Sequence, residues 1–115
     1  LPGIPAPWHI ADTGDFDGDG RADILWRDQD TGQSTIWFMN GGAIAGNADL
    51  PGISAPWDMV ETADYNGDGK SDILWRNEST GQNTVWFMDG GNIIGNADLP
   101  TIGAPWHIVH DGVLV

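Results

Sequence analysis

The chain repeats itself with an offset of 49 residues, and this repeat restricts its fold more than any other feature. Residues 1–49 align with residues 50–98 without a gap, and 31 of the 49 aligned positions are identical. Most of the differences are mild, as between Phe16 and Tyr65, and a third, partial copy begins at Leu99. Self-similarity at a fixed period of this size predicts similar supersecondary units that stack on one another.

Each full repeat contains a loop with oxygen-bearing side chains at loop positions 1, 3, 5 and 9 and glycine at position 6. The first loop, residues 15–23, carries Asp15, Asp17, Asp19 and Asp23; the second, residues 64–72, carries Asp64, Asn66, Asp68 and Asp72. Ca²⁺ takes about six to eight oxygen ligands, which alternate residues of a tight loop can supply. Four carboxylates in one loop also repel one another unless a cation is bound. We therefore interpret both loops as calcium sites, with one Ca²⁺ per full repeat and two per chain.

The loops differ from the calcium loop of an EF-hand. An EF-hand requires a bidentate Glu at loop position 12 and a helix on either side. Position 12 is Trp26 in the first loop and Trp75 in the second, and strand-like residues follow both. The closing ligand is therefore predicted at position 9, which is Asp23 or Asp72. The alternative without a metal is an Asp-Gly-rich turn whose carboxylates cap their own backbone.

The remainder of each repeat predicts short strands and no helix. Apolar runs are short and interrupted by Gly, Pro and Asn, and the Asn40-Gly41-Gly42 sequence predicts a hairpin. We expect strands at residues 8–13, 23–27, 34–39 and 43–48 in the first repeat, and at 57–62, 72–76, 83–88 and 92–97 in the second. The second and third strands of each repeat are apolar on both faces, so each sheet should lie between neighbours. Four such strands per repeat are typical of a β-propeller blade.

The predicted fold is therefore all-β, with two four-stranded blades plus one extra strand at 104–109. Residues 1–49 form blade 1, residues 50–98 form blade 2, and residues 99–115 form a partial third repeat. Propellers close with about four to eight blades, so we expect oligomerisation to complete the ring, as a trimer or a tetramer. The extra strand would latch onto a neighbouring chain. A fragment of a larger propeller is the alternative.

The Asp-x-Asp/Asn-x-Asp-Gly-x-x-Asp loop that enters an Ile-Leu-Trp strand resembles the FG-GAP/VCBS repeats. These include the propeller blades of integrin α-subunits and many bacterial surface proteins. The resemblance covers both full repeats and implies a structural Ca²⁺ in each loop. It implies the ligands Asp15, Asp17, Asp19, the Arg21 carbonyl and Asp23 in the first loop, and Asp64, Asn66, Asp68, the Lys70 carbonyl and Asp72 in the second. It also implies an extracellular or cell-surface location.

Composition disfavours several functions. The net charge of −13, with only four Lys and Arg residues, repels phosphate backbones and disfavours nucleic acid. No apolar run reaches the roughly 18–20 residues of a membrane span, so no membrane insertion is expected. No Ser or Cys lies beside an evident base, and no carboxylate pair lies outside the loops, so we expect no enzyme activity. A calcium-dependent phosphoesterase is the less favoured alternative.

Seven Trp residues in 115 positions are the other unusual feature. Trp26 and Trp37 lie in strands that should be covered on both faces, so we assign them to packing. Trp8, Trp57 and Trp106 follow Pro at strand starts and are the candidate ligand-binding residues, because aromatic faces stack on sugar rings. We expect extracellular recognition of carbohydrate or protein, with a purely structural or engineered assembly module as the competitor. Arg27 and Arg76 should pair with nearby carboxylates such as Asp28 or Glu78.

Overall fold

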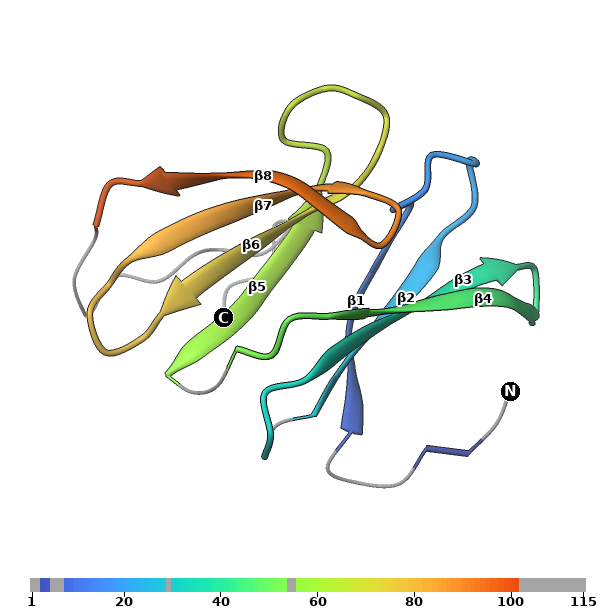
Figure 1. The fold of residues 1–115 in the computed structure, drawn as a ribbon, viewed down its shortest axis with the longest axis horizontal. Helices are drawn as coiled ribbons and strands as arrows, with labels where there is room; N and C mark the ends of the chain where they lie inside the picture. Colours follow the sequence, from blue (N-terminus) through green and yellow to red (C-terminus); the bar gives the residue numbers. More distant parts are fainter. Residues whose placement is uncertain (1–2, 5–7, 29, 54–55, 102–115) are drawn as a thin grey trace.

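The computed structural model describes residues 3–4, 8–28, 30–53 and 56–101 and contains eight strands in two antiparallel sheets (Figure 1). The first sheet consists of β1 (Trp8–Gly14), β2 (Asp23–Asp28), β3 (Ser34–Asn40) and β4 (Ala43–Leu50). The second sheet consists of β5 (Trp57–Ala63), β6 (Asp72–Asn77), β7 (Asn83–Asp89) and β8 (Asn92–Leu99). The described residues include no helix, which confirms the predicted all-β class.

Each sheet forms within one repeat, and its strands follow chain order from one edge to the other. All eight predicted strands are present, and each extends one or two residues beyond its predicted end. We call the two sheets blade 1 and blade 2. The expected extra strand at 104–109 lies outside the described residues, and ring closure by oligomerisation stays a prediction.

Glycine turns separate the outer strands of each blade. The β3–β4 turn begins at Gly41, which has a φ of 62°, and the β7–β8 turn begins at Gly90 with the same value. A residue with a Cβ rarely adopts this left-handed conformation, so Gly41 and Gly90 fix these hairpins.

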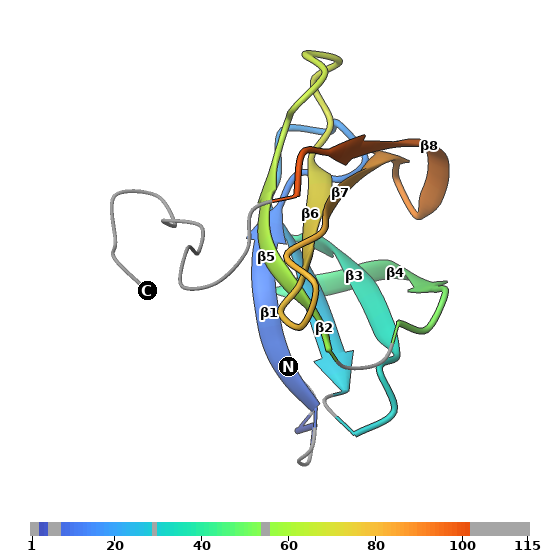
Figure 2. The ribbon, with the colours of Figure 1, turned by 90° about the vertical axis from the view of Figure 1, so that its left-hand side faces the viewer.

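Bulges bend the strands, and the sequence did not predict them. The pairing of β1 with β2 shifts between Ile10 and Asp12, and β5 repeats the shift between Met59 and Glu61. The pairing of β3 with β4 shifts after Phe38. Such extra residues increase the local twist of a sheet. Figure 2 shows β1 and β5 along one side of the twisted pair and β4 and β8 along the other.

The hydrophobic core lies between the two blades. Its buried members are Phe16, Leu25, Ile36, Leu50, Ile73, Trp75 and Met88. Because side chains alternate along a strand, each blade has two different faces. We call the face of Leu25 and Ile36 in blade 1, and of Leu74 and Val85 in blade 2, the Leu face. We call the opposite face the Trp face; it carries Ile24, Trp26 and Trp37 in blade 1 and Ile73, Trp75 and Trp86 in blade 2. The core therefore joins the Leu face of blade 1 to the Trp face of blade 2.

A buried arginine crosses this interface. Arg27 is 4% exposed, and its Nη2 donates to the carbonyl oxygens of Ile53 at 2.6 Å and Trp57 at 3.1 Å. Its guanidinium carbon lies 5.0 Å from the centroid of the Trp75 ring. The prediction of a carboxylate partner is thus wrong for Arg27. It is confirmed for Arg76, whose Nε lies 3.0 Å from Glu78.

Candidate metal centre

Both acidic loops turn through glycines with positive φ. In the first loop Gly18 has a φ of 76° and Gly20 a φ of 84°; in the second, Gly67 and Gly69 have φ values of 78° and 85°. These left-handed residues occupy loop positions 4 and 6, between the acidic positions. A side chain at either would strain the turn, so the glycines let the carboxylates converge.

The carboxylates converge within each loop. Oxygens of Asp15, Asp17 and Asp19 all lie within 4.8 Å of one another, and so do oxygens of Asp64, Asp68 and Asp72. Two oxygens bound to one Ca²⁺ lie at most about 5 Å apart, since each lies about 2.3–2.6 Å from the ion. The donor set and its spacing therefore fit one hard cation per loop.

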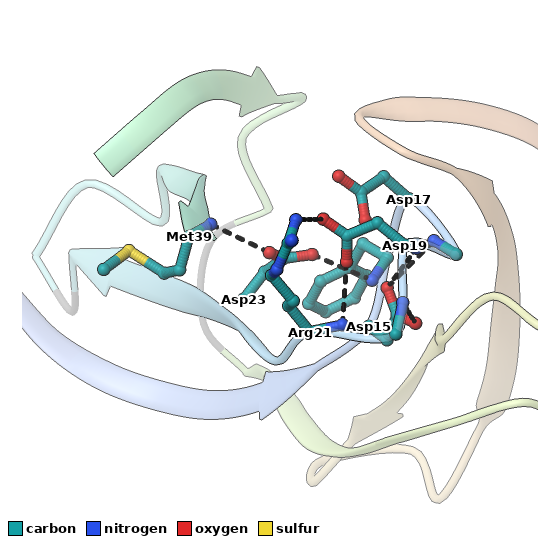
Figure 3. Close-up of polar contacts among 9 residues, drawn as sticks. Asp15, Asp17, Asp19, Arg21, Asp23 and Met39 are labelled. Atoms are coloured by element: carbon teal, nitrogen blue, oxygen red, sulfur yellow. Dashed lines mark hydrogen bonds and ion pairs between the residues drawn. The ribbon is translucent and has the colours of Figure 1, made fainter. Parts of the chain in front are cut away.

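The carboxylate at loop position 1 organises the loop backbone. Oδ1 of Asp15 accepts hydrogen bonds from Gly18 N at 2.9 Å and Asp19 N at 3.1 Å, and Oδ2 accepts one from Gly20 N at 2.8 Å (Figure 3). Asp64 makes the same three bonds in the second loop. These bonds form the self-capped turn weighed above as the alternative without a metal. The lone pairs left on each carboxylate keep it available as a metal ligand.

The same contacts shift the acidity of these groups. Partial burial acts to raise the pKa of Asp15, but the amide donors, Gly20 foremost, outweigh it and hold the pKa below its ordinary value. The pKa of Asp64 is lowered chiefly by the hydrogen bond from Gly69. Both groups are therefore charged at neutral pH.

The carboxylate at position 9 ties the loop to the blade. Asp23 is fully buried, and its Oδ2 accepts from Phe16 N at 3.1 Å while its Oδ1 accepts from Met39 N at 2.9 Å (Figure 3). Asp72 makes the equivalent bonds with Tyr65 and Met88. This carboxylate thus anchors the start of the loop to the third strand. Asp72 belongs to the oxygen cluster of its loop, whereas the cluster of the first loop consists of Asp15, Asp17 and Asp19.

Burial and crowding oppose the charge on the remaining acids. Desolvation raises the pKa of Asp23 and of Asp72, despite the hydrogen bonds that they accept. The pKa of Asp17 is also raised, by desolvation and by the nearby charges of Asp23 and Asp19. A bound cation would offset both effects.

The basic residues of the loops contact acidic side chains. Arg21 N donates to Oδ1 of Asp19 at 2.8 Å, and its guanidinium lies 3.6 Å from the same carboxylate. Lys70 N donates to Asp68 at 2.9 Å, and Nζ pairs with Asp89 at 3.5 Å. The carbonyl oxygens of Arg21 and Lys70 stay predicted ligands.

Asn66 occupies loop position 3, where the first loop has Asp17. Its Oδ1 accepts from Asp68 N at 3.3 Å, as Oδ1 of Asp17 does from Asp19 N. The amide therefore reproduces the local contact of the carboxylate without its charge.

The first loop is also held by blade 2. The carbonyl oxygen of Asp15 accepts from Ser71 N at 2.7 Å, and Asp15 N donates to Oγ of Ser71 at 3.0 Å. The carbonyl oxygen of Phe16 accepts from Gly90 N at 2.8 Å. The sequence analysis did not identify Ser71 as a contact of the first loop. The available signal was the difference between Ser71 and its counterpart Ala22. The first acidic loop is therefore part of the contact between the blades.

The three candidate ligand-binding tryptophans have different surroundings. Trp8 lies half-buried at the start of β1, and Trp57 packs against the core cluster at the start of β5. Trp106 lies outside the described residues. Trp26 and Trp37 contact each other at 5.0 Å between ring centroids, as do Trp75 and Trp86. Ligand contact by Trp8, Trp57 or Trp106 stays a prediction.

The chain matches a known protein family. The model of a family described as FG-GAP-like repeat matches residues 15–75, which is more than half of the 115-residue chain. The match runs from the first residue of the first loop into β6 and so covers both acidic loops. No curated protein and no solved structure matches the chain. Among the described residues, no helix is long and apolar enough to span a membrane.

Proposed function

Because the chain belongs to the FG-GAP-like repeat family, we propose that it is a calcium-stabilised β-propeller module for extracellular recognition. Each full repeat holds one structural Ca²⁺, and the module binds a carbohydrate or a protein. Copies of the chain associate to extend the array of blades.

The observation that carries this proposal is the convergence of three carboxylates within 4.8 Å in each of two equivalent loops. In the first loop Asp15, Asp17 and Asp19 would hold the ion, and the second loop offers Asp64, Asp68 and Asp72. Bound Ca²⁺ neutralises carboxylates that otherwise repel one another. At a tenfold excess over its dissociation constant, each ion would stabilise the fold by about 1.4 kcal/mol.

The arginines favour recognition over phosphoester hydrolysis. Arg27 and Arg76 are each only 4% exposed and are used inside the blades. The other two basic residues, Arg21 and Lys70, contact acidic side chains. A phosphate substrate would need cationic groups to bind it, and these four residues have other partners.

A structural role without a ligand is the second candidate. Its support is the use of the tryptophans in packing: Trp26 contacts Trp37, Trp75 contacts Trp86, and Trp57 packs on the core. Trp75 is buried and the other four rings are half-buried, so packing already uses part of each ring. Under this alternative the chain is a building block of a larger array.

Binding to a glycan array, read in calcium and again in chelator, separates the two candidates. The recognition proposal expects reproducible binding that is lost in chelator and reduced by Trp8→Ala. Ile94→Ala, which shortens a 59% exposed side chain of β8 in blade 2, is the control and should leave binding unchanged. A pull-down from an extracellular extract tests protein ligands in the same buffers. Absence of binding in both assays would support the structural role.

A further inference from the structure

We propose that two copies of this chain associate through unlike faces. The Trp face of blade 1 in the second copy docks onto the Leu face of blade 2 in the first copy. The docked pair would reproduce the contact that joins the two blades within one chain. This inference rests on the association that the proposed function includes, and it names the surfaces and residues involved.

The Leu face of blade 2 and the Trp face of blade 1 are more exposed to solvent than the equivalent faces that meet within the chain. On the Leu face, Phe16 is 0% and Leu50 is 7% exposed in blade 1, whereas the equivalent Tyr65 and Leu99 of blade 2 are 42% and 44% exposed. The centre of that face, Leu74 and Val85, is buried in the single chain.

On the Trp face, Trp75 and Ile73 of blade 2 are fully buried, whereas the equivalent Trp26 and Ile24 of blade 1 are half-buried. Ile10, which adjoins them on β1, is 53% exposed. Both free faces thus keep apolar side chains that lack the cover found inside the chain.

The polar groups that join the blades recur on the free faces. Arg76 is the counterpart of Arg27, and Trp26 is the counterpart of the Trp75 ring on which Arg27 lies. Arg76 Nη1 bonds within its blade to Gly81 O at 3.3 Å, as Arg27 Nη1 bonds to Gly32 O. In the docked pair, Arg76 would therefore lie over Trp26 of the second copy.

Two differences between the repeats balance one another in side-chain size across the proposed contact. Within the chain, Gly14 faces Ser71, and a Cβ at Gly14 would lie 2.8 Å from Oγ of Ser71. The equivalent positions on the free faces are Ala63 and Ala22. A glycine with a serine has the same number of side-chain heavy atoms as two alanines. At the same spacing the two alanine Cβ atoms would lie 3.0 Å apart, the distance from the Cβ position of Gly14 to Cβ of Ser71, so the second contact must open by a few tenths of an ångström.

The β7–β8 turn shows how tightly the blades meet. A Cβ at Gly91 would lie 2.2 Å from Cβ of Ala48 in blade 1, so only glycine fits there. Its counterpart Gly42, in the β3–β4 turn, has nothing within 4 Å of a Cβ, and the counterpart of Ala48 is Ala97. In Figure 1 the β7–β8 turn reaches toward blade 1, whereas the β3–β4 turn lies at the margin away from blade 2. In the single chain there is thus room for a larger side chain at position 42, although the residue is glycine.

The proposed contact joins unlike faces, so it is not an isologous contact in which the same face of two copies meets. Head-to-tail contacts of this kind produce closed rings or open filaments. Two blades per chain give even blade numbers, so a ring of about four to eight blades contains two, three or four chains.

Sedimentation velocity over a range of concentrations tests the inference, with the intact chain in calcium. The wild type should sediment as a closed oligomer, and Gly42→Ala should weaken association at least about tenfold, equivalent to about 1.4 kcal/mol. Gly42→Gln should leave a monomer. Gly46→Ala, whose Cβ meets only Phe38 at 3.8 Å, is the matched control and should associate like the wild type.

A monomeric wild type at every concentration, or association of Gly42→Gln equal to that of the wild type, would overturn the inference. Thermal melting of the dilute variants checks that each one folds. Calcium titration of the same samples distinguishes a failure of docking from a failure of calcium binding. Intact calcium binding without association would contradict this inference and the association on which it rests but not the calcium sites, whereas absent calcium binding would contradict the calcium-stabilised module.

Discussion

Nη2 of Arg27 donates a hydrogen bond of 2.6 Å to the carbonyl oxygen of Ile53, and this bond joins the second strand of blade 1 to the segment that enters blade 2. Burial lowers the pKa of Arg27, while the charge of Asp58 opposes that shift. Nη2 of the buried cation bonds to two carbonyl oxygens and the guanidinium lies over Trp75, whereas its buried Nε has no hydrogen-bond partner among the described residues. The packing of the two blades is therefore specified by polar contacts as well as by apolar area.

Arg27→Ala should destabilise the fold by at least about 2 kcal/mol, because it removes hydrogen bonds from a charged donor and a desolvated cation–π contact. Urea unfolding followed by Trp fluorescence measures the loss. Arg21→Ala, at a side chain that is 57% exposed, should change stability in chelator by no more than about 0.5 kcal/mol. Equal effects of the two substitutions would contradict the role given to Arg27.

Phe16 and Tyr65 occupy equivalent positions but should respond differently to truncation. Phe16 is 0% exposed between the blades, so Phe16→Ala should cost about 3–5 kcal/mol. Tyr65 is 42% exposed, and Tyr65→Ala should cost clearly less in the monomer. Urea unfolding at low protein concentration provides the comparison. A larger loss of unfolding free energy from Tyr65→Ala than from Phe16→Ala would contradict the position of the core at Phe16.

Gly91→Ala should destabilise the monomer by about 1–3 kcal/mol, because the new methyl group overlaps Ala48. Gly42→Ala, at the equivalent turn position, should leave the monomer nearly unchanged because its Cβ meets nothing within 4 Å. Thermal melting of dilute samples measures both. Similar melting temperatures for the two variants would show that the blades do not meet at Gly91.

The acidity of Asp64 predicts a pH dependence in chelator. Its pKa in the folded chain lies below the ordinary value of 3.8, so its contribution to stability is present above pH 3.8 and is lost as the pH falls through the folded pKa. Asp64→Asn should therefore melt below the wild type at neutral pH, and the difference should shrink below pH 3.8. A difference that stays constant or grows on acidification would reverse the sign of this linkage.

Most of the fold could be predicted from the sequence, because local chemistry specifies it. The Gly41 and Gly90 turns, the short apolar strands and the 49-residue repeat together defined two four-stranded sheets. The converging carboxylates followed from the spacing of Asp15, Asp17 and Asp19 in the same way. Such features depend on residues close together in the chain.

What the sequence could not show depends on contacts between the blades. Arg27 looked like a surface partner for a carboxylate, and only the approach of Ile53 and Trp57 gives it a buried role. Two nearly identical repeats also predict equal surroundings for Phe16 and Tyr65, whereas the stacking of unlike faces covers only the first. The contact of Ser71 with the first loop also depends on how the blades meet, so the sequence could not show it.

Isothermal titration with Ca²⁺ tests the central claim, that each acidic loop holds one ion. The wild type should bind two ions per chain, and Asp19→Ala or Asp68→Ala should each leave one. Asp49→Ala, which removes an exposed carboxylate of β4 outside the loops, is the control of equal charge and should still bind two. Absence of binding heat in the wild type, or two ions bound by both loop variants, would contradict the account.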